Sequence, residues 1–449
     1  MTTYWCRQAW LGAATDVADG VVLDVADGRF AAVSTGLPPP KGAVLLDGLV
    51  VPGYANCHSH VFHRALRGRA QRGGGSFWTW REQMYALAER LNPDTFQRLA
   101  AGTYVEMAGA GMTAVGEFHY LHHQPGGRPY DDPNVMAHAA IAAAREAGLR
   151  ITLLDTCYLG AGFGRPVEGG VQLRFSDGDA SRWAARVDRL AAEYSGAADV
   201  VVGAALHSVR AVPADQIETV ATWAGERGVP LHVHVSEQPA ENAECLAATG
   251  LTPTALLAEH GVVGPGATVV HATHLGDDDI TTLGREQTYT CFCPTTERDL
   301  ADGVGPSRAL AAAGARLTLG TDSHAVIDMS EEMRAIEMGE RLVTLRRGSW
   351  QAMELLTAAT ATGQASLGYP AAGTLSAGSR ADLVCLRTDS ARTAGSGSSA
   401  ETAVFAATSA DVSDVVAGGR HIVAEGRHAV LPQAAGELDA VVHALMAHR

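Results

Sequence analysis

The chain has 449 residues, of which 47% are hydrophobic and 18% are charged, and its formal net charge is −15. This composition excludes a disordered chain, which would contain fewer apolar residues and more charge. The acidic balance and the lack of a basic cluster argue against nucleic acid or an anionic membrane as the main partner. Lys41 is the only lysine, so the other 33 basic residues are arginine.

No apolar run reaches the ~18 residues that a membrane-spanning helix needs. The segment from Met1 to Ala9 also lacks the basic and apolar regions of a signal peptide. The seven cysteines are odd in number and scattered along the chain, which is not the pattern of a disulfide framework. We therefore expect a cytoplasmic protein that has reduced thiols and no contact with a membrane.

The first 50 residues contain short β-rich runs separated by turn signals, and they predict a small β unit. From about residue 93, helical stretches alternate with short apolar runs, which predicts parallel strands joined by helical crossovers. With a first strand before this region, the predicted strands are 49–55, 113–117, 150–155, 200–206, 230–235, 268–271, 289–292 and 316–319. Eight such strands close a (β/α)₈ barrel.

The β-rich pattern returns after Gly373, around the run Gly-Ser-Arg-Ala-Asp-Leu-Val that begins at Gly378. Because both ends are β-rich, we expect one small β domain built from residues 1–50 and 369–449. Residues 51–368 are predicted to form the barrel between them. The predicted fold class is therefore α/β, a barrel with a small second domain.

The chemistry of such a barrel lies at the carboxyl ends of its strands. His58 and His60 follow strand 1, His234 lies at the end of strand 5, and Asp322 follows strand 8. A histidine pair two residues apart is common in packing or at the surface, so the indication comes from the combination. Imidazole and carboxylate suit one divalent cation, with Zn²⁺ as our first expectation and Fe²⁺ as the alternative.

These motifs resemble the amidohydrolase superfamily, in which they build the metal site together with a histidine after strand 6. The run that begins at Gly378 also resembles the β-sandwich return of that superfamily. Binuclear members use a carboxylated lysine after strand 4, but Lys41 precedes the barrel. The resemblance is therefore to mononuclear aminohydrolases, in which a glutamate lies three residues after the strand-5 histidine, as Glu237 follows His234.

Longer blocks resemble the formimidoylglutamate deiminase family within this superfamily. They begin at Phe77 (Phe-Trp-Thr-Trp-Arg), Gly116 (Gly-Glu-Phe-His-Tyr), His207 (His-Ser-Val-Arg), His232 (His-Val-His-Val-Ser-Glu-Gln) and Cys293 (Cys-Pro-Thr-Thr-Glu). The resemblance implies hydrolysis of N-formimino-L-glutamate to N-formyl-L-glutamate and ammonia in histidine degradation. One position departs from it, because His63 stands where the family has a glutamine.

Roles for three residues follow from this chemistry. A cation held by neutral histidines and a carboxylate lowers the pKa of its water toward ~7. Asp322 can accept a proton from that water, Glu237 can hold or protonate the imino nitrogen, and His271 can polarise the adduct. His274 competes with His271 for the last role, and we favour His271 because it lies nearer the end of its strand.

A glutamate substrate carries two carboxylates, and the planar guanidinium of arginine binds carboxylate through two hydrogen bonds. Arg81, expected in a loop after strand 1, and Arg210, after strand 4, are the candidates. Tyr120, His207 and His63 are expected to add polar contacts to this small-molecule dicarboxylate. Assembly as a homodimer is the default expectation.

Two alternatives stay open. A mononuclear aminohydrolase of the same superfamily could deaminate a purine or another heterocycle, but such a substrate would not need the two arginines. A barrel kept only for binding or assembly would be expected to have lost part of its metal set, which here is complete.

Overall fold

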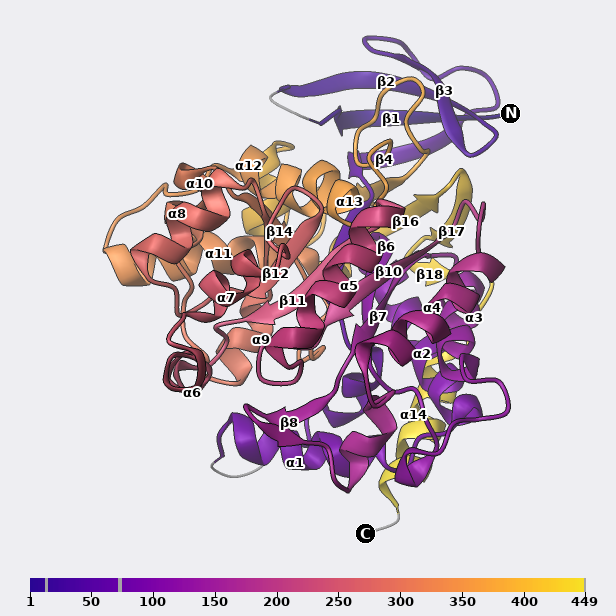
Figure 1. Ribbon diagram of the computed structural model, residues 1–449. Helices are drawn as coiled ribbons and strands as arrows, with labels where there is room; N and C mark the ends of the chain where they lie inside the picture. Colours follow the sequence, from indigo (N-terminus) through magenta and orange to yellow (C-terminus); the bar gives the residue numbers. More distant parts are fainter. Residues whose placement is uncertain (13–14, 72–74, 448–449) are drawn as a thin grey trace.

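The computed structural model describes residues 1–12, 15–71 and 75–447, and its centre is a barrel of eight parallel strands (Figure 1). The barrel strands are β5 (Tyr54–Ser59), β6 (Met112–His119), β7 (Arg150–Cys157), β10 (Val200–Leu206), β11 (Leu231–Val235), β12 (Ala267–His271), β13 (Tyr289–Phe292) and β14 (Arg316–Leu319). Each pairs with its neighbour in chain order. The barrel closes where Ser59 bridges Asp322 and where the amide of Asp322 donates to the carbonyl of His58 at 2.9 Å. The predicted (β/α)₈ barrel is confirmed.

Helices surround the barrel and cover the outer side of its strands (Figure 1). They are α1 (Phe77–Ala88), α2 (Pro93–Gly109), α3 (Val135–Ala147), α4 (Ala180–Glu193), α5 (Ala214–Arg227), α6 (Pro239–Thr249), α7 (Pro253–Glu259), α8 (Asp277–Arg285), α9 (Pro294–Asp299), α10 (Ser307–Ala313), α11 (Met329–Thr344), α12 (Ala352–Thr357) and α13 (Gly363–Ser366). Local sequence sets several ends: the Asp179 side chain caps α4, and Gly148 ends α3 in the left-handed conformation. Short elements at the barrel mouth are η1 (Val61–Leu66), η3 (Val171–Phe175) and the hairpin of β8 (Gly160–Gly162) with β9 (Arg165–Pro166).

A second sheet is built from both ends of the chain, which confirms the predicted small β domain. It contains β1 (Thr2–Trp10), β2 (Val17–Ala26), β3 (Arg29–Ser34), β4 (Val44–Pro52), β15 (Leu383–Leu386), β16 (Val412–Ala417), β17 (Arg420–Ala424) and β18 (Arg427–His428). Strand β4 joins the two ends, because it pairs with β1 in parallel and with β15 in antiparallel orientation. Strands β1–β4 of this domain lie at the top of Figure 1, far from α1 and β8, and β16–β18 lie below them beside the barrel.

The predicted first barrel strand, 49–55, is wrong in its bounds. Residues 49–52 belong to β4 of the small β domain, and the barrel strand β5 starts at Tyr54 and runs through His58. Gly53 separates the two strands, and a Cβ there would overlap the side chain of Thr113. Since both strands are buried and apolar, the sequence pattern shows one continuous run where the chain changes sheet.

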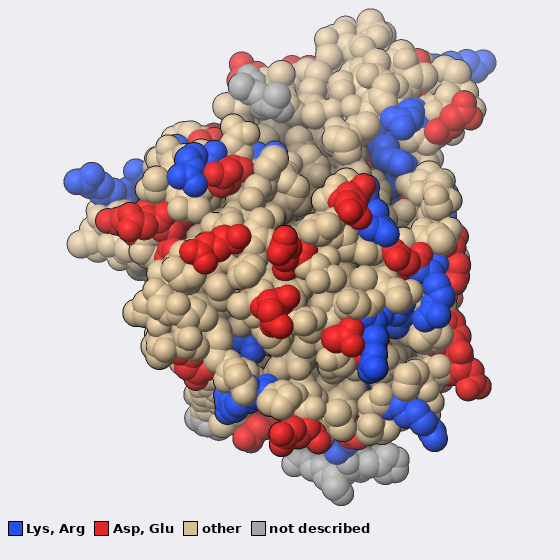
Figure 2. Space-filling model, in the orientation of Figure 1, with Lys and Arg blue, Asp and Glu red and all other residues tan. Residues whose placement is uncertain are grey.

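The C-terminal helix α14 (Ala434–Met446) packs against α2 of the barrel, where Gly102 lets Leu438 approach closely. The domain boundaries near residues 50 and 368 stay a prediction. In the described ranges, no helix combines the length and the apolar character needed to span a bilayer. Acidic and basic side chains alternate over the face in Figure 2, so the net negative charge is not gathered into one patch there.

One buried ion pair joins the two domains. Arg150, at the start of β7, donates to both carboxylate oxygens of Asp382, at 2.9 and 2.6 Å, and to Gln364 at 2.9 Å. The side chains of Arg150 and Asp382 are 5% and 0% exposed. Removing one member of such a pair leaves a buried charge uncompensated, which is strongly destabilising.

We predict that Asp382→Asn lowers the free energy of unfolding by about 3–5 kcal/mol, measured by urea denaturation. The control Asp389→Asn changes an exposed aspartate seven residues away and should have little effect. Adding Arg150→Met to Asp382→Asn should recover part of the loss. Equal stability of Asp382→Asn and Asp389→Asn would contradict the role given to the ion pair.

Candidate active site

The polar side chains at the carboxyl ends of the strands surround one open cavity. The empty space of this cavity, together with the open space at its mouth, is about 720 Å³. Its lining includes His60, His63, Arg81, Tyr120, His207, Arg210, His234, Glu237, His271 and Asp322. These residues lie at or after the ends of six barrel strands, apart from Arg81, which follows β5 at a greater distance in the chain. The strand-end pattern predicts such a meeting at one place.

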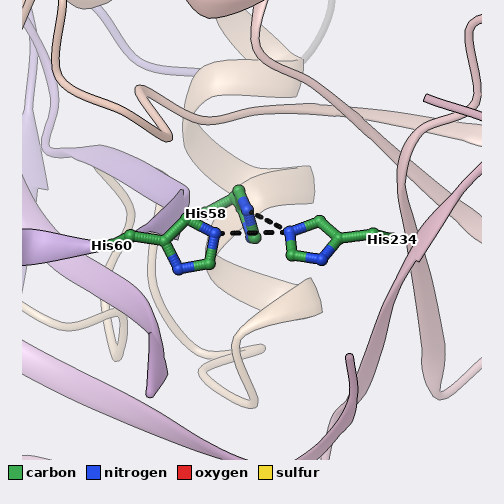
Figure 3. A group of neighbouring side chains, drawn as sticks. All are labelled: His58, His60 and His234. Atoms are coloured by element: carbon green, nitrogen blue, oxygen red, sulfur yellow. Dashed lines mark hydrogen bonds between the residues drawn. The ribbon is translucent and has the colours of Figure 1, made fainter. Parts of the chain in front are cut away.

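Three histidines and one aspartate converge at the bottom of this cavity. The Nε2 atom of His234 lies 3.0 Å from Nε2 of His58 and 3.3 Å from Nε2 of His60 (Figure 3). The Oδ1 atom of Asp322 lies 3.4 Å from both His58 Nε2 and His60 Nε2. A tetrahedral zinc site with bonds of ~2.0–2.1 Å has ligand atoms about 3.3 Å apart. The spacing therefore fits a cation at the centre.

The hydrogen bonds on the far side of two rings support this assignment. The Nδ1 atoms of His60 and His234 each lie 2.9 Å from a backbone carbonyl oxygen, of Phe118 and His207 respectively. A carbonyl only accepts, so both Nδ1 atoms carry the hydrogen and the Nε2 atoms of the neutral rings are bare. Burial lowers the pKa of both histidines and keeps the rings neutral. Two bare nitrogens facing each other at 3.3 Å repel unless a cation lies between them.

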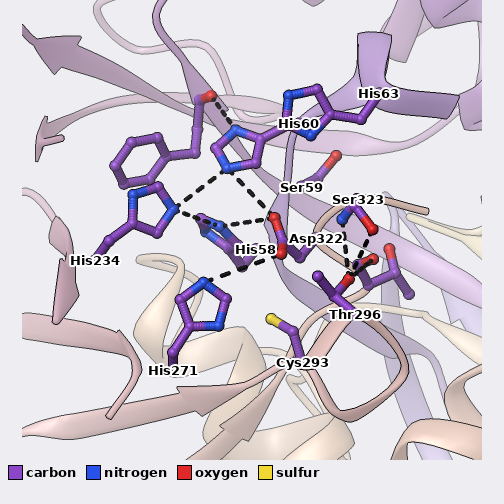
Figure 4. A network of polar contacts seen from close by, with 12 residues as sticks. His58, Ser59, His60, His63, His234, His271, Cys293, Thr296, Asp322 and Ser323 are labelled. Atoms are coloured by element: carbon purple, nitrogen blue, oxygen red, sulfur yellow. Dashed lines mark hydrogen bonds and ion pairs between the residues drawn. The ribbon is translucent and has the colours of Figure 1, made fainter. Parts of the chain in front are cut away.

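His271 lies beside this cluster (Figure 4), and Glu237 is its neighbour in the cavity lining. The His271 ring nitrogens lie 3.8 Å from Glu237, 4.0 Å from Asp322 and, on the other side, 3.4 Å from Glu297. Burial acts to lower the pKa of His271, but Glu237 and the other carboxylates outweigh it and raise that pKa. Burial raises the pKa of Glu237 to about 7, with His271 opposing the change and Asp322 reinforcing it. Glu237 is thus suited to exchange protons near neutral pH, whereas the raised pKa of His271 favours its protonated form.

The backbone at these strand ends is strained. Ser236, His271, Ala272, Asp322 and His324 all have positive φ angles between 42° and 70°, although none is a glycine. Such conformations persist where surrounding structure imposes them, and they cluster at functional sites. His274, the alternative to His271, lies outside the cavity lining, and its Nε2 contacts the carbonyl oxygen of Asp302 at 2.8 Å.

All five residues expected to contact a substrate line the cavity. The His63 Nε2 atom lies 2.8 Å from the Tyr120 hydroxyl, and the ring of His207 packs against Tyr120 at 5.7 Å. Arg81 does not lie in a loop as expected. It is on helix α1, which Ser76 and Thr79 start through a capping box, and its guanidinium lies 4.5 Å from the ring centre of Trp78.

Four buried carboxylates near the site received no role from the sequence. Glu117 accepts hydrogen bonds from the Ser59 hydroxyl at 2.6 Å and the Val61 amide at 2.8 Å, and burial raises its pKa to about 8. Glu297 contacts His271, and Asp302 accepts a bond from Gln238. Glu241 lies beside Arg210. Glu117 and Glu297 occur in blocks already singled out, whereas Glu241 and Asp302 have no local signal in the sequence.

Comparison with known proteins identifies the family. The model of the amidohydrolase family matches residues 49–422. The chain belongs to the amidohydrolase family. A formimidoylglutamate deiminase from Pseudomonas aeruginosa is 38% identical over 424 residues, which cover 92% of this chain and 91% of that protein. A 5'-deoxyadenosine deaminase from Methanothermobacter thermautotrophicus is 28% identical, with 92% of this chain and 91% of that protein covered.

Solved structures of amidohydrolases share the whole fold. An amidohydrolase from Brucella melitensis superposes with a TM-score of 0.92 at 32% identity, covering 99% of this chain and 100% of that one. An adenosine deaminase from Xanthomonas campestris with bound zinc gives 0.84 at 22% identity and covers 98% of each chain. At that lower identity the likeness shows the fold alone. The family resemblance predicted from the sequence motifs is confirmed, and this amidohydrolase is a hydrolase.

The contact between Glu297 and His271 can be tested in metal-free protein. Glu297→Gln removes one of the negative charges that raise the pKa of His271, so this pKa should fall toward its ordinary value. The measurement is an NMR titration of the histidine ring nitrogens. Asp299→Asn, an exposed change on the same helix, serves as the control. An unchanged titration of His271 in Glu297→Gln would contradict the contact.

Proposed function

We propose that this amidohydrolase hydrolyses N-formimino-L-glutamate to N-formyl-L-glutamate and ammonia, a step of histidine degradation. One observation carries the proposal: two arginines line the same cavity as the histidine and carboxylate cluster. Arg81 and Arg210 suit the two carboxylates of the substrate, whereas a neutral purine has no negative charge for them to neutralise. The 38% identity to a formimidoylglutamate deiminase supports the same assignment.

We assign His58, His60, His234 and Asp322 as the ligands of one divalent cation, with zinc as the first expectation and Fe²⁺ as the alternative. When bound, such a cation acts as a Lewis acid and makes water acidic near neutral pH. The structural relative from Xanthomonas campestris contains zinc. A second cation bridged by a carboxylated lysine is not expected, since Lys41 is exposed and precedes β4 of the small β domain.

The remaining residues move protons and stabilise charge. Asp322 takes a proton from the attacking water, and the protonated His271 stabilises the charge that develops on the adduct. The formimino carbon then carries two nitrogens, and the one that receives a proton leaves. As water adds, Glu237, with a pKa of about 7, can protonate the terminal imino nitrogen to an amine. The hydroxyl proton of the adduct then passes back to Glu237, and Asp322 returns the proton taken from water to that amine, so that ammonia departs, the carbonyl forms and the glutamate nitrogen stays bonded.

The substrate is oriented by the other side chains of the cavity. Arg81, held over the Trp78 ring, and Arg210, near Tyr158, receive the carboxylates. Tyr120, His207 and His63 supply polar contacts between them. His63 replaces the family's glutamine and keeps a ring nitrogen for bonding, because only its Nε2 contacts Tyr120 while its buried Nδ1 has no partner in the described chain. Cytoplasmic location and assembly as a homodimer stay predictions.

The test of this proposal is an ammonia-release assay on zinc-loaded protein. We expect turnover of N-formimino-L-glutamate and at least a hundredfold lower kcat/KM for guanine, adenosine and 5'-deoxyadenosine, since a site built for charged groups rejects ligands that leave them unpaired. Glu237→Gln should abolish turnover and serves as the check for a contaminating enzyme. Clear turnover of a purine together with none of formiminoglutamate would reverse the assignment in favour of a purine aminohydrolase.

A further inference from the structure

Glu241 is a buried carboxylate in the first turn of α6, and its side chain is 1% exposed. Neither of its carboxylate oxygens makes a hydrogen bond within the described residues. The backbone amides of Ser236 and Glu237 are its nearest polar neighbours in the main chain. Burial raises the pKa of Glu241, and the positive charge of Arg210 opposes that change. A carboxylate in such a place is costly unless it serves a charged partner.

Arg210 is the partner that the structure provides. Its Nε atom lies 3.7 Å from the Oε2 atom of Glu241, and this Nε is fully buried without a hydrogen bond in the described chain. Its side chain is 15% exposed and lines the cavity. Since Nε is enclosed on the Glu241 side, the exposed part of the guanidinium is its terminal end. That end is free to bind a ligand carboxylate.

A second carboxylate competes for the same guanidinium. Arg210 lies near Glu237 as well as Glu241, and its positive charge lowers the pKa of both carboxylates. Glu237 also lies 3.8 Å from His271, where the proposed proton transfer takes place. Without Glu241, Arg210 would retain Glu237 as its facing carboxylate and would turn toward the reacting end of the cavity.

We propose that Glu241 is a positioning residue: it holds Arg210 by the Nε edge, so that the terminal nitrogens of the guanidinium point to a substrate carboxylate and away from Glu237. The inference rests on the proposed function, because it gives the cavity a carboxylate ligand. In this role Glu241 selects anionic substrates through Arg210 and does not contact the substrate itself.

The test measures ligand binding as well as catalysis. Isothermal titration calorimetry compares three ligands: N-formyl-L-glutamate, N-formyl-L-glutamine without the side-chain carboxylate, and N-formyl-4-aminobutyrate without the α-carboxylate. Glu241→Gln should weaken N-formyl-L-glutamate about 10- to 100-fold. One of the two analogues keeps the carboxylate that Arg210 binds, and the binding of this analogue should weaken to the same extent. Binding of the other analogue should change less than twofold.

The controls separate this role from a loss of structure. Glu244→Gln makes the same change of charge at an exposed position of α6 and should leave all three affinities unchanged. Glu241→Asp keeps the charge and should recover part of the binding. In turnover of N-formimino-L-glutamate, Glu241→Gln should raise KM about 10- to 100-fold, whereas Glu244→Gln should leave KM unchanged.

Two outcomes would overturn the inference, and they can be told apart. Equal weakening of all three ligands, or unchanged binding of N-formyl-L-glutamate, by Glu241→Gln would refute the positioning role alone. If the native protein binds none of the three ligands and does not hydrolyse formiminoglutamate, the proposed function fails and this inference fails with it.

Discussion

Four ligand atoms converge at the closing seam of the barrel: the Nε2 atoms of His58, His60 and His234 and an oxygen of Asp322, with neighbouring atoms 3.0–3.4 Å apart. His58 and Asp322 come from the first and the last strand, and their backbones are hydrogen-bonded at 2.9 Å. Closing the barrel and assembling the ligand set are therefore the same structural event. A cation at this point would stabilise the folded barrel as well as the reaction, because the ligands do not meet in the unfolded chain.

Buried polar groups behind the ligands hold this arrangement. Ser59 donates to Glu117 and lies 3.1 Å from the Nε2 atom of His324, whose Nδ1 lies 2.9 Å from the Thr321 hydroxyl. Asn56 completes the chain of contacts with two hydrogen bonds to Thr321. Its Oδ1 accepts from the backbone amide of Thr321 at 2.9 Å, and its Nδ2 donates to the Thr321 hydroxyl at 2.7 Å. These groups connect the first and last strands on the side away from the cavity. They explain how positive φ angles persist at Asp322 and His324.

Much of the fold follows from the sequence because its pattern is local. The alternation of apolar runs and helical stretches sets the eight strands, and parallel strands bring residues that follow them to one end of the barrel. This is why His58, His60, His234, His271 and Asp322 could be grouped before the structure was considered. The change of sheet at Gly53 is not visible in that pattern, since both sides of it are buried strands.

The carboxylates behind the site could not be predicted, for a different reason. Glu241 and Asp302 lie on helices or loops where a glutamate or aspartate is ordinarily exposed, and only the folded chain brings them against Arg210 and Gln238. The structure around Arg81 was also not predicted, although its neighbours are close in sequence. We expected Arg81 in a loop after strand 1, but the capping box at Ser76 begins a helix that places Trp78 under the Arg81 guanidinium.

Binding of one cation at the seam between the first and last strands can be tested by anomalous diffraction. Data from crystals of the zinc-loaded protein would be recorded above and below the zinc absorption edge. We expect a single strong peak within bonding distance of His58, His60, His234 and Asp322. Two peaks at the site, or a peak bound by other residues, would contradict it.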